Sequence, residues 1–417
     1  MGWVTAEHPT TEELNACVQC GLCLPVCPTF RLTGRETASP RGRLHAMKAV
    51  HEGVLTVDEA FEGIIDFCLG CRACEPVCPG MVPYGRALEG TRAEIAAQIP
   101  SLSHRIRAFA LGDVLGSPTV LRMGTAVLGL AQRLRLTRLA PGRFRRVVGG
   151  LRELKGRPSE TRGHKGGSGR SGTVGLLAGC IQDQWFRPVN RAAIELLEMA
   201  GYQVEAPESQ TCCGALAAHD GKAKEAHRLA KVNVEAFAGY DMVVVTSAGC
   251  SAHTREYEHW ADRGEDLGGR ALDVTVAVAR AIDQGLLPTL HTDLGPIAIQ
   301  DPCHLRHAQR ITREPRAILE AAGYSVTEID PVGMCCGAAG MYTTLQPEAS
   351  QQLGNQKADQ VRSTGVMKVA SANPGCEMQL RAALGPKYRI GHPIEWYLQA
   401  IEQEGSVVSV ADVEAES

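Results

Sequence analysis

CVQCGLCLPVCP at 17–28 and CLGCRACEPVCP at 68–79 are two copies of one cysteine pattern, C-x2-C-x2-C-x3-C-P. This spacing is typical of loops that bind cubane [4Fe–4S] clusters, where three thiolates hold one cluster and the fourth holds its neighbour. Zinc ligands do not follow triplets of this spacing, which disfavours a structural zinc site. The predicted ligand sets are Cys17, Cys20, Cys23 and Cys78 for one cluster, and Cys68, Cys71, Cys74 and Cys27 for the other.

The residues around these runs predict a helical module. Ser39 and Pro40 stand where a helix begins, because serine caps a helix and proline suits its first position. Residues 84–98 also have a helical composition. We therefore expect residues 1–100 to form a helical dicluster ferredoxin domain, and two adjacent clusters predict electron transfer.

The composition narrows the class of protein. The 417 residues contain 16 cysteines, which we assign to metal binding in a reducing cytoplasm, since disulfide frameworks belong to small secreted domains. The sequence has no run of about 18 uncharged apolar residues, so we expect no membrane-spanning helix. The first residues lack the basic and apolar regions of a secretory signal. A cytoplasmic protein is the expectation.

Residues 101–172 are predicted to be a basic helical connector that ends in a Gly/Ser/Arg-rich linker. Within 101–170 there are 15 Lys and Arg against three Asp and Glu, although the whole chain carries a charge of −3. Such segregation favours an anionic partner. One interpretation is peripheral contact with the inner face of the cell membrane. We favour the other, a solvated helical hairpin that packs on the ferredoxin module or on a partner subunit, and we expect no nucleic acid.

The rest of the chain repeats itself. Cys180, Cys212 and Cys213 recur as Cys303, Cys335 and Cys336 at an offset of 123, and Cys250 recurs as Cys376 at an offset of 126. Strands and helices alternate in both copies, so we expect two related α/β units with parallel strands. Their predicted bounds are 173–290 and 291–405, followed by a tail at 406–417. The fold class is therefore mixed: a helical dicluster ferredoxin domain followed by two repeated α/β (CCG) units.

Each repeat offers four thiols at strand ends, where α/β proteins bind ligands. The glycine after each Cys-Cys pair allows positive φ or a close backbone approach. A further iron–sulfur cluster or a zinc ion is predicted there, and inert buried thiols are the alternative. Nearby histidines are candidates for ligands, proton relays or orienting groups, and His253 is the best candidate ligand: His219, His253, His304 and His307.

With these motifs in view, the chain resembles the iron–sulfur subunit of bacterial glycolate oxidase over nearly its full length. The stretch Pro40–Arg43 matches what that family is expected to have. Parts are similar to the iron–sulfur subunit of anaerobic glycerol-3-phosphate dehydrogenase, to lactate-utilisation iron–sulfur proteins and to the CCG-containing subunit of heterodisulfide reductase. The last of these carries non-cubane clusters on C-x-x-C pairs, whereas here Cys250 and Cys376 are followed three residues later by His253 and Gln379.

The resemblance implies an electron-transfer subunit that passes electrons from a partner FAD-containing 2-hydroxy-acid dehydrogenase subunit towards quinone. No dinucleotide fingerprint follows a predicted strand, so we expect neither flavin nor NAD on this chain. An equivalent subunit of a glycerol-3-phosphate or lactate dehydrogenase is one alternative. A CCG-type thiol–disulfide reductase is another, and a scaffold stabilised by its clusters is a third. No residue is assigned a catalytic role.

Overall fold

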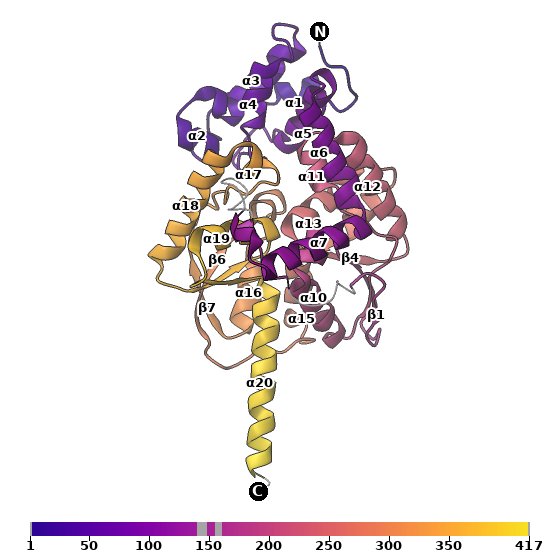
Figure 1. The fold of residues 1–417 in the computed structure, drawn as a ribbon, viewed down its shortest axis with the longest axis vertical. Coiled ribbons are helices and arrows are strands. Elements are labelled where there is room, and N and C mark those ends of the chain that lie inside the picture. Colours follow the sequence, from indigo (N-terminus) through magenta and orange to yellow (C-terminus); the bar gives the residue numbers. More distant parts are fainter. Residues whose placement is uncertain (1, 140–147, 155–160, 416–417) are drawn as a thin grey trace.

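The computed structural model describes residues 2–139, 148–154 and 161–415 (Figure 1). A helical module lies at one end of the molecule, two α/β units lie beside each other below it, and the C-terminal helix α20 projects from the opposite end. This arrangement confirms the predicted mixed fold class.

The helical module holds both ferredoxin-type cysteine runs in its loops. At the start of α3, the side chain of Ser39 accepts the Gly42 N–H and Pro40 takes the first helical position, as predicted. The first run lies between α1 and α2, and the second lies between α4 and α5. The helices are α1 (Thr11–Asn15), α2 (Pro28–Thr33), η1 (Glu36–Ala38), α3 (Pro40–His51), α4 (Glu59–Asp66) and α5 (Tyr84–Gln98).

The first α/β unit contains a five-stranded sheet in the order β1-β3-β2-β4-β5. All neighbours pair in parallel except β1 and β3. Its strands are β1 (Lys165–Gly166), β2 (Thr173–Leu177), β3 (Gln203–Glu205), β4 (Met242–Val245) and β5 (Ala271–Asp273). Its helices are α9 (Ile181–Trp185), α10 (Arg187–Met199), α11 (Ala215–His219), α12 (Ala223–Ala236), α13 (Ala248–Arg255), η4 (Tyr257–His259), α14 (Gly264–Arg270) and α15 (Val274–Asp283).

The second α/β unit repeats this plan with four parallel strands in the order β7-β6-β8-β9. Its strands are β6 (Gly295–Gln300), β7 (Tyr324–Glu328), β8 (Lys368–Ser371) and β9 (Arg389–Gly391). Its helices are η5 (His304–Ala308), α16 (Arg313–Ala321), α17 (Tyr342–Leu345), α18 (Pro347–Ser363), α19 (Pro374–Leu384) and α20 (Pro393–Ala415). The predicted repeat and the predicted parallel pairing are confirmed.

The strand order explains where the repeated cysteines lie. The chain leaves β2 for β3 on one side and then crosses to β4 on the other, so the strand order reverses beside β2. The carboxyl ends of strands at such a reversal form the ligand-binding edge of an open α/β sheet. Cys180 follows β2 and Cys250 follows β4, and β6 and β8 deliver Cys303 and Cys376 in the same way.

The Gly/Ser/Arg-rich stretch differs from the expected linker. Residues 165–166 form β1, which pairs antiparallel with β3 at the edge of the first sheet, so this unit begins before residue 173. His164 anchors the stretch, because its Nε2 lies 2.7 Å from Glu198 Oε1 on α10. The part of the expected linker at 155–160 lies outside the described residues. At the other end of the chain, α20 continues to Ala415 and takes in most of the expected tail.

The two α/β units share one apolar core. Helices α10 and α15 of the first unit pack against α16 and α20 of the second. Side chains of both sheets belong to the same buried cluster, including Val174, Leu176, Ile297 and Ile299. Burial at this scale disfavours independent movement of the two units.

The connector consists of α6 (Leu102–Ala108), η2 (Phe109–Val114), α7 (Pro118–Arg133) and η3 (Leu136–Leu139). It contacts the ferredoxin module through His104 Nε2 and Glu62 Oε1 at 2.9 Å. It also packs on the first α/β unit, where Arg107 Nη1 lies 2.8 Å from Asp220 Oδ1. The expected packing on the ferredoxin module is therefore only part of the arrangement, because the helices bridge two parts of the chain.

The solvent side of the connector carries many large apolar side chains among exposed arginines such as Arg105 and Arg133. It exposes the large side chains Leu102, Ile106, Phe109, Val120, Met123, Val127, Leu130 and Leu134. Among the described residues, no single helix has the length and hydrophobicity needed to cross a bilayer. One pair of helical segments has the required length and hydrophobicity when taken together, but it is bent by 101° between Leu102–Val114 and Pro118–Arg133.

An ion pair joins the N-terminal segment to the first α/β unit and predicts a pH dependence. His227 Nε2 lies 2.9 Å from Glu7 Oε1, and its Nδ1 lies 2.7 Å from Trp260 O. The hydrogen bond to Glu7 raises the pKa of His227 above 6.5, and the bond to His227 lowers the pKa of Glu7 below 4.5. Arg86 and His259 also face Glu7.

The directions of these two pKa shifts determine how the stability of the N-terminal segment changes with pH. The stabilisation by His227 is complete below its ordinary pKa and is lost as pH rises through the raised value; that of Glu7 is lost as pH falls through the lowered value. We expect the amide protection factors of the N-terminal segment, which are corrected for the intrinsic base-catalysed exchange rate, to fall as pH rises past neutrality, and His227→Gln to remove that fall. His45→Gln, at an exposed site, is the control. Equal pH profiles for wild type and His227→Gln would contradict the assignment.

Candidate iron–sulfur centres

Four thiols from two distant loops meet at the first site. Cys17, Cys20, Cys23 and Cys78 line one small cavity of about 30 Å³, which Cys74 also borders. The loop turns tightly here, with positive φ at Gln19 and Gly21. Arg41 holds the turn, because its Nη1 donates to Gln19 O at 3.0 Å. Cys20 is exposed, so this site lies at the surface of the module.

The second site is buried in the module. The thiols of Cys27, Cys68, Cys71 and Cys74 are all buried. Burial raises the pKa of Cys74, and repulsion from Cys71, Cys68 and Cys27 raises it further. The four predicted ligands therefore lie within electrostatic reach of one another. Such a group of thiols releases protons when metal binds, because the ligands are thiolates.

Donors surround the sulfurs of the second site. The Gly70 N–H lies 3.4 Å from Cys68 Sγ, and the Tyr84 hydroxyl lies 3.6 Å from the same atom. The Thr29 hydroxyl also lies 3.3 Å from Cys27 Sγ, but it donates its proton to Ala38 O at 2.6 Å. Hydrogen bonds to sulfur and burial are the means by which proteins tune iron–sulfur clusters, so this environment fits such a group.

Arg43 places a buried positive charge beside these thiols. Its guanidinium donates to Ile64 O and Ala38 O, both at 2.9 Å, and it meets no carboxylate of the described residues. Burial lowers the pKa of Arg43, but nearby Cys68, Tyr84 and Cys27 outweigh burial and raise it. The arginine of the Pro40–Arg43 stretch thus supplies a counter-charge for thiolates.

Removal of that charge is expected to change a reduction potential. A cluster gains negative charge on reduction, and a fixed cation favours the reduced state. Arg43→Met should therefore lower the midpoint of the buried centre, and Arg43→Lys should restore much of it, as measured by a redox titration followed by EPR. Arg41→Met, beside the exposed site, is the matched control. A midpoint unchanged in Arg43→Met would rule out this role.

The repeated cysteines form two further groups. In the first α/β unit, Cys180 Sγ lies 3.2 Å from Cys212 Sγ, and Cys213 contacts both Cys212 and Cys250. In the second, Cys336 Sγ lies 3.1 Å from Cys376 Sγ, and Cys335 contacts Cys303 and Cys336. Each unit therefore brings its four predicted thiols together.

The glycine after each Cys-Cys pair shapes the site. Gly214 and Gly337 have φ of 88° and 84°, in the left-handed region that favours glycine. The turn directs the Gly337 N–H at Cys335 Sγ, 3.5 Å away. The Gly214 N–H likewise bonds to Cys212 and helps lower the pKa of that thiol, although the main causes are its bonds to Cys180 and Cys213.

Both groups open on one shared cavity of about 400 Å³. All eight repeat cysteines line it, together with Cys68, Arg92, His219 and His304. The N-termini of the helices that carry Cys250 and Cys376 are joined directly, since Asn373 Oδ1 accepts the Gly249 N–H at 3.1 Å. In the described part of the chain, no three His, Cys, Asp or Glu side chains converge tightly enough to hold a single metal ion.

Cys71 links the ferredoxin module to the second repeat. Its thiol is hydrogen-bonded to that of Cys335, and this contact is the main cause that raises the pKa of Cys71. Leu69, Cys71, Cys335 and Tyr342 belong to one buried apolar cluster. The second ferredoxin site and the second CCG site are therefore neighbours.

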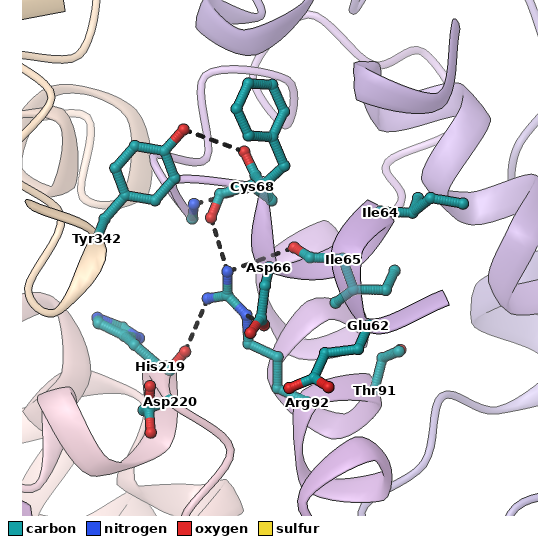
Figure 2. Close-up of polar contacts among 12 residues, drawn as sticks. Glu62, Ile64, Ile65, Asp66, Cys68, Thr91, Arg92, His219, Asp220 and Tyr342 are labelled. Atoms are coloured by element: carbon teal, nitrogen blue, oxygen red, sulfur yellow. Dashed lines mark hydrogen bonds and ion pairs between the residues drawn. The ribbon is translucent and has the colours of Figure 1, made fainter. Parts of the chain in front are cut away.

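Arg92 clamps the module to the first repeat, as Figure 2 shows. Its guanidinium donates to Cys68 O at 2.6 Å and to His219 O at 2.7 Å. Tyr342 approaches from the second repeat and donates to Phe67 O at 3.4 Å. Sequence reasoning missed Arg92, because nothing in its neighbourhood along the chain marks it as an interface residue.

The four histidines separate into two environments. His219 stacks on His304 with ring centroids 5.1 Å apart, and His253 meets His219 edge-on at 6.1 Å. His307 lies apart, with its Nε2 2.8 Å from Gly333 O. His219 Nδ1 lies 2.6 Å from the carboxylate of Glu89, a second residue that sequence reasoning missed.

Comparisons with known proteins agree with this architecture. Residues 13–82 match the 4Fe-4S dicluster domain, and residues 174–255 and 297–381 each match the cysteine-rich (CCG) domain. The chain is 34% identical to the probable glycolate oxidase iron–sulfur subunit of Bacillus subtilis (strain 168), over 94% of this chain and 95% of that protein.

Two further relatives are similar over most of their length. The glycolate oxidase iron–sulfur subunit of Escherichia coli (strain K12) is 30% identical, over 94% of this chain and 95% of the relative. A subunit of the fumarate reductase (CoM/CoB) of Methanothermobacter marburgensis is 26% identical, over 91% of this chain and 70% of the relative. These similarities confirm the resemblance inferred from the cysteine motifs.

Proposed function

Since the chain belongs to the family of the glycolate oxidase iron–sulfur subunits, we propose that it is the electron-transfer subunit of a flavin-dependent 2-hydroxy-acid oxidase complex. The partner chain carries FAD and oxidises glycolate or a related substrate, and this chain passes the electrons onward towards quinone. Iron–sulfur clusters, when bound, accept and release electrons one at a time, which suits a flavin that takes two from an alcohol.

The observation that carries this proposal is the contiguity of the thiol sites. They extend from exposed Cys20 through the buried ferredoxin site, across the contact of Cys71 with Cys335, to the shared cavity. A protein whose clusters served only to stabilise its fold would have no need for such a continuous series. The contiguity therefore supports electron transfer over a scaffold role.

The proposed ligands follow from the four groups of thiols. One [4Fe–4S] cluster is held by Cys17, Cys20, Cys23 and Cys78, and the other by Cys27, Cys68, Cys71 and Cys74. The CCG thiols hold further iron–sulfur clusters. Gly70, Tyr84 and Arg43 stabilise the thiolates of the buried ferredoxin site.

Two regions of the surface are proposed to contact partners. Cys20 and its loop present the first ferredoxin site to solvent, where the flavoprotein would dock. The exposed apolar side of α6 and α7 lies in the basic connector and suits a partner subunit or the inner face of the membrane.

Co-expression with the flavoprotein tests the proposal. The complex should show glycolate-dependent reduction of a quinone analogue, and this chain alone should show none. A screen with lactate and glycerol-3-phosphate identifies the substrate of the partner. Oxidation of glycolate by the isolated chain, or an unchanged rate of quinone reduction by the flavoprotein without it, would refute the division of labour.

A thiol–disulfide reductase is the second candidate. The observation that favours it is the shared cavity, which is about 400 Å³ and is lined by thiols of both repeats. Reduction of a small disulfide by the pre-reduced chain, at a rate comparable to quinone reduction by the complex, would favour this candidate.

A further inference from the structure

His253 and Gln379 occupy equivalent places in the two repeats. Each stands three residues after the last cysteine of its unit, Cys250 on α13 and Cys376 on α19. Residues three apart lie on one face of a helix, so both side chains face the same way as the cysteine before them. The first repeat thus has an imidazole where the second has an amide.

Both side chains reach the same point of the CCG turn. His253 Nε2 lies 3.5 Å from the position that a Cβ would take at Gly214, and Gln379 Nε2 lies 3.4 Å from the corresponding position at Gly337. These glycines follow the Cys-Cys pairs directly. The two nitrogens therefore lie at matching places beside the thiol groups.

The two nitrogens differ in their partners. Gln379 Nε2 donates to Ser350 O at 2.8 Å. His253 Nε2 is buried and has no hydrogen-bond partner among the described residues, and His253 as a whole is only 2% exposed. Leaving a buried polar atom unpaired costs about 1–3 kcal/mol. A nitrogen kept in this state beside thiols indicates a partner that the polypeptide does not supply.

The surroundings hold the imidazole in place. Its ring lies 5.5 Å from that of Tyr257 and 5.6 Å from that of Trp260, centroid to centroid. The Tyr257 hydroxyl in turn donates to Cys213 O at 2.7 Å. This aromatic packing fixes the ring against the loop that carries the cysteine pair, as a ligand requires.

We propose that His253, through Nε2, is a ligand of the iron–sulfur cluster in the first CCG unit, at the place where the second unit has the amide of Gln379. The inference rests on the proposed function in one respect, namely that the CCG thiols hold a cluster. An imidazole is neutral and a thiolate is negative, and replacement of thiolate by imidazole raises the potential of iron–sulfur centres. The first CCG centre therefore has a higher potential than it would have with a thiolate in place of His253.

Pulsed EPR of the reduced holoprotein labelled with ¹⁵N-histidine tests the assignment. We expect histidine nitrogen hyperfine coupling on one centre. The coupling should be lost in His253→Gln, which copies the residue of the second unit, and retained in His307→Gln. A cysteine at this position supplies a thiolate instead, so His253→Cys should shift the midpoint of that one centre downward and leave the two ferredoxin midpoints unchanged.

The outcomes separate this inference from the proposed function. Iron beyond the content of two [4Fe–4S] clusters, without histidine coupling and with a His253→Cys midpoint equal to wild type, would overturn the inference alone. Iron equal to two clusters only, about eight per chain, would overturn it together with the proposed CCG clusters. Coupling that depends on His219 in place of His253 would also overturn it. Unchanged ferredoxin signals confirm that each variant has folded.

Discussion

Replacement of Cys78 by serine is expected to remove the cluster of the first cysteine run, although Cys78 belongs to the second run. The physical reason is that Cys78 shares a cavity with Cys17, Cys20 and Cys23. Iron should fall by about four per chain, and one of the two cubane EPR signals should be lost. Electron transfer from the flavoprotein should fall to background, because the exposed end of the series is gone.

Cys27→Ser is the matched control and the reciprocal test. Cys27 lies within electrostatic reach of Cys74 and is buried, so its loss should affect the buried centre. The Arg43→Met shift described above then identifies which EPR signal belongs to that centre. If Cys78→Ser instead removed the signal that responds to Arg43, the crossed assignment of the fourth cysteines would be wrong.

Arg152→Met is expected to lower the free energy of unfolding by about 3–5 kcal/mol, the usual cost of breaking a buried ion pair from one side. Arg152 lies in the described segment 148–154 of the connector and bridges two buried carboxylates. It meets Glu377 Oε2 and Glu395 Oε1, both at 2.6 Å. Its loss would leave these carboxylates without their shared guanidinium.

The second repeat provides the control for this prediction. Arg381 also pairs with Glu377 at 2.6 Å, but its side chain is 29% exposed, against 13% for Arg152. We expect Arg381→Met to cost about 1 kcal/mol, as a partly exposed pair does. Denaturant unfolding of the holoprotein, followed by circular dichroism, measures both variants. Equal losses would show that burial does not set the cost here.

The effect of Arg152 also bears on the second CCG site. Glu377 follows Cys376 directly on α19, so the ion pair holds the helix that presents this thiol. Loss of iron from the second CCG site at temperatures below global unfolding would show that the connector stabilises the site itself.

Local features were predictable because neighbours along the chain decide them. Ser39 and Pro40 begin α3, as a capping serine and a first-turn proline should. The offsets of 123 and 126 correctly implied two related α/β units with parallel strands. The Gly/Ser/Arg-rich stretch was misjudged, because its composition resembles a linker while β3 leaves an open edge that residues 165–166 can pair with.

Contacts between residues that are far apart along the chain could not be predicted from the sequence motifs. Arg92 joins Cys68 to His219, and Glu89 bonds to His219, across more than 100 residues of chain. The connector was expected to pack on the ferredoxin module or on a partner subunit, and it contacts the ferredoxin module and both α/β units. Such contacts depend on how finished elements pack, which the local sequence does not specify.

The sequence by itself determined that this is an iron–sulfur protein with two ferredoxin loops and two cysteine-rich α/β units, because ligand spacing within a loop is a property of the local chain. Only the tertiary structure decided that Cys71 lies against Cys335 and that one cavity serves both repeats. It also decided that His253 Nε2 has no hydrogen-bond partner among the described residues, whereas Gln379 Nε2 has one. The reason is that burial of the shared apolar core brings these residues together. The free energy of burial depends on the apolar area that is buried and not on where the residues lie along the chain.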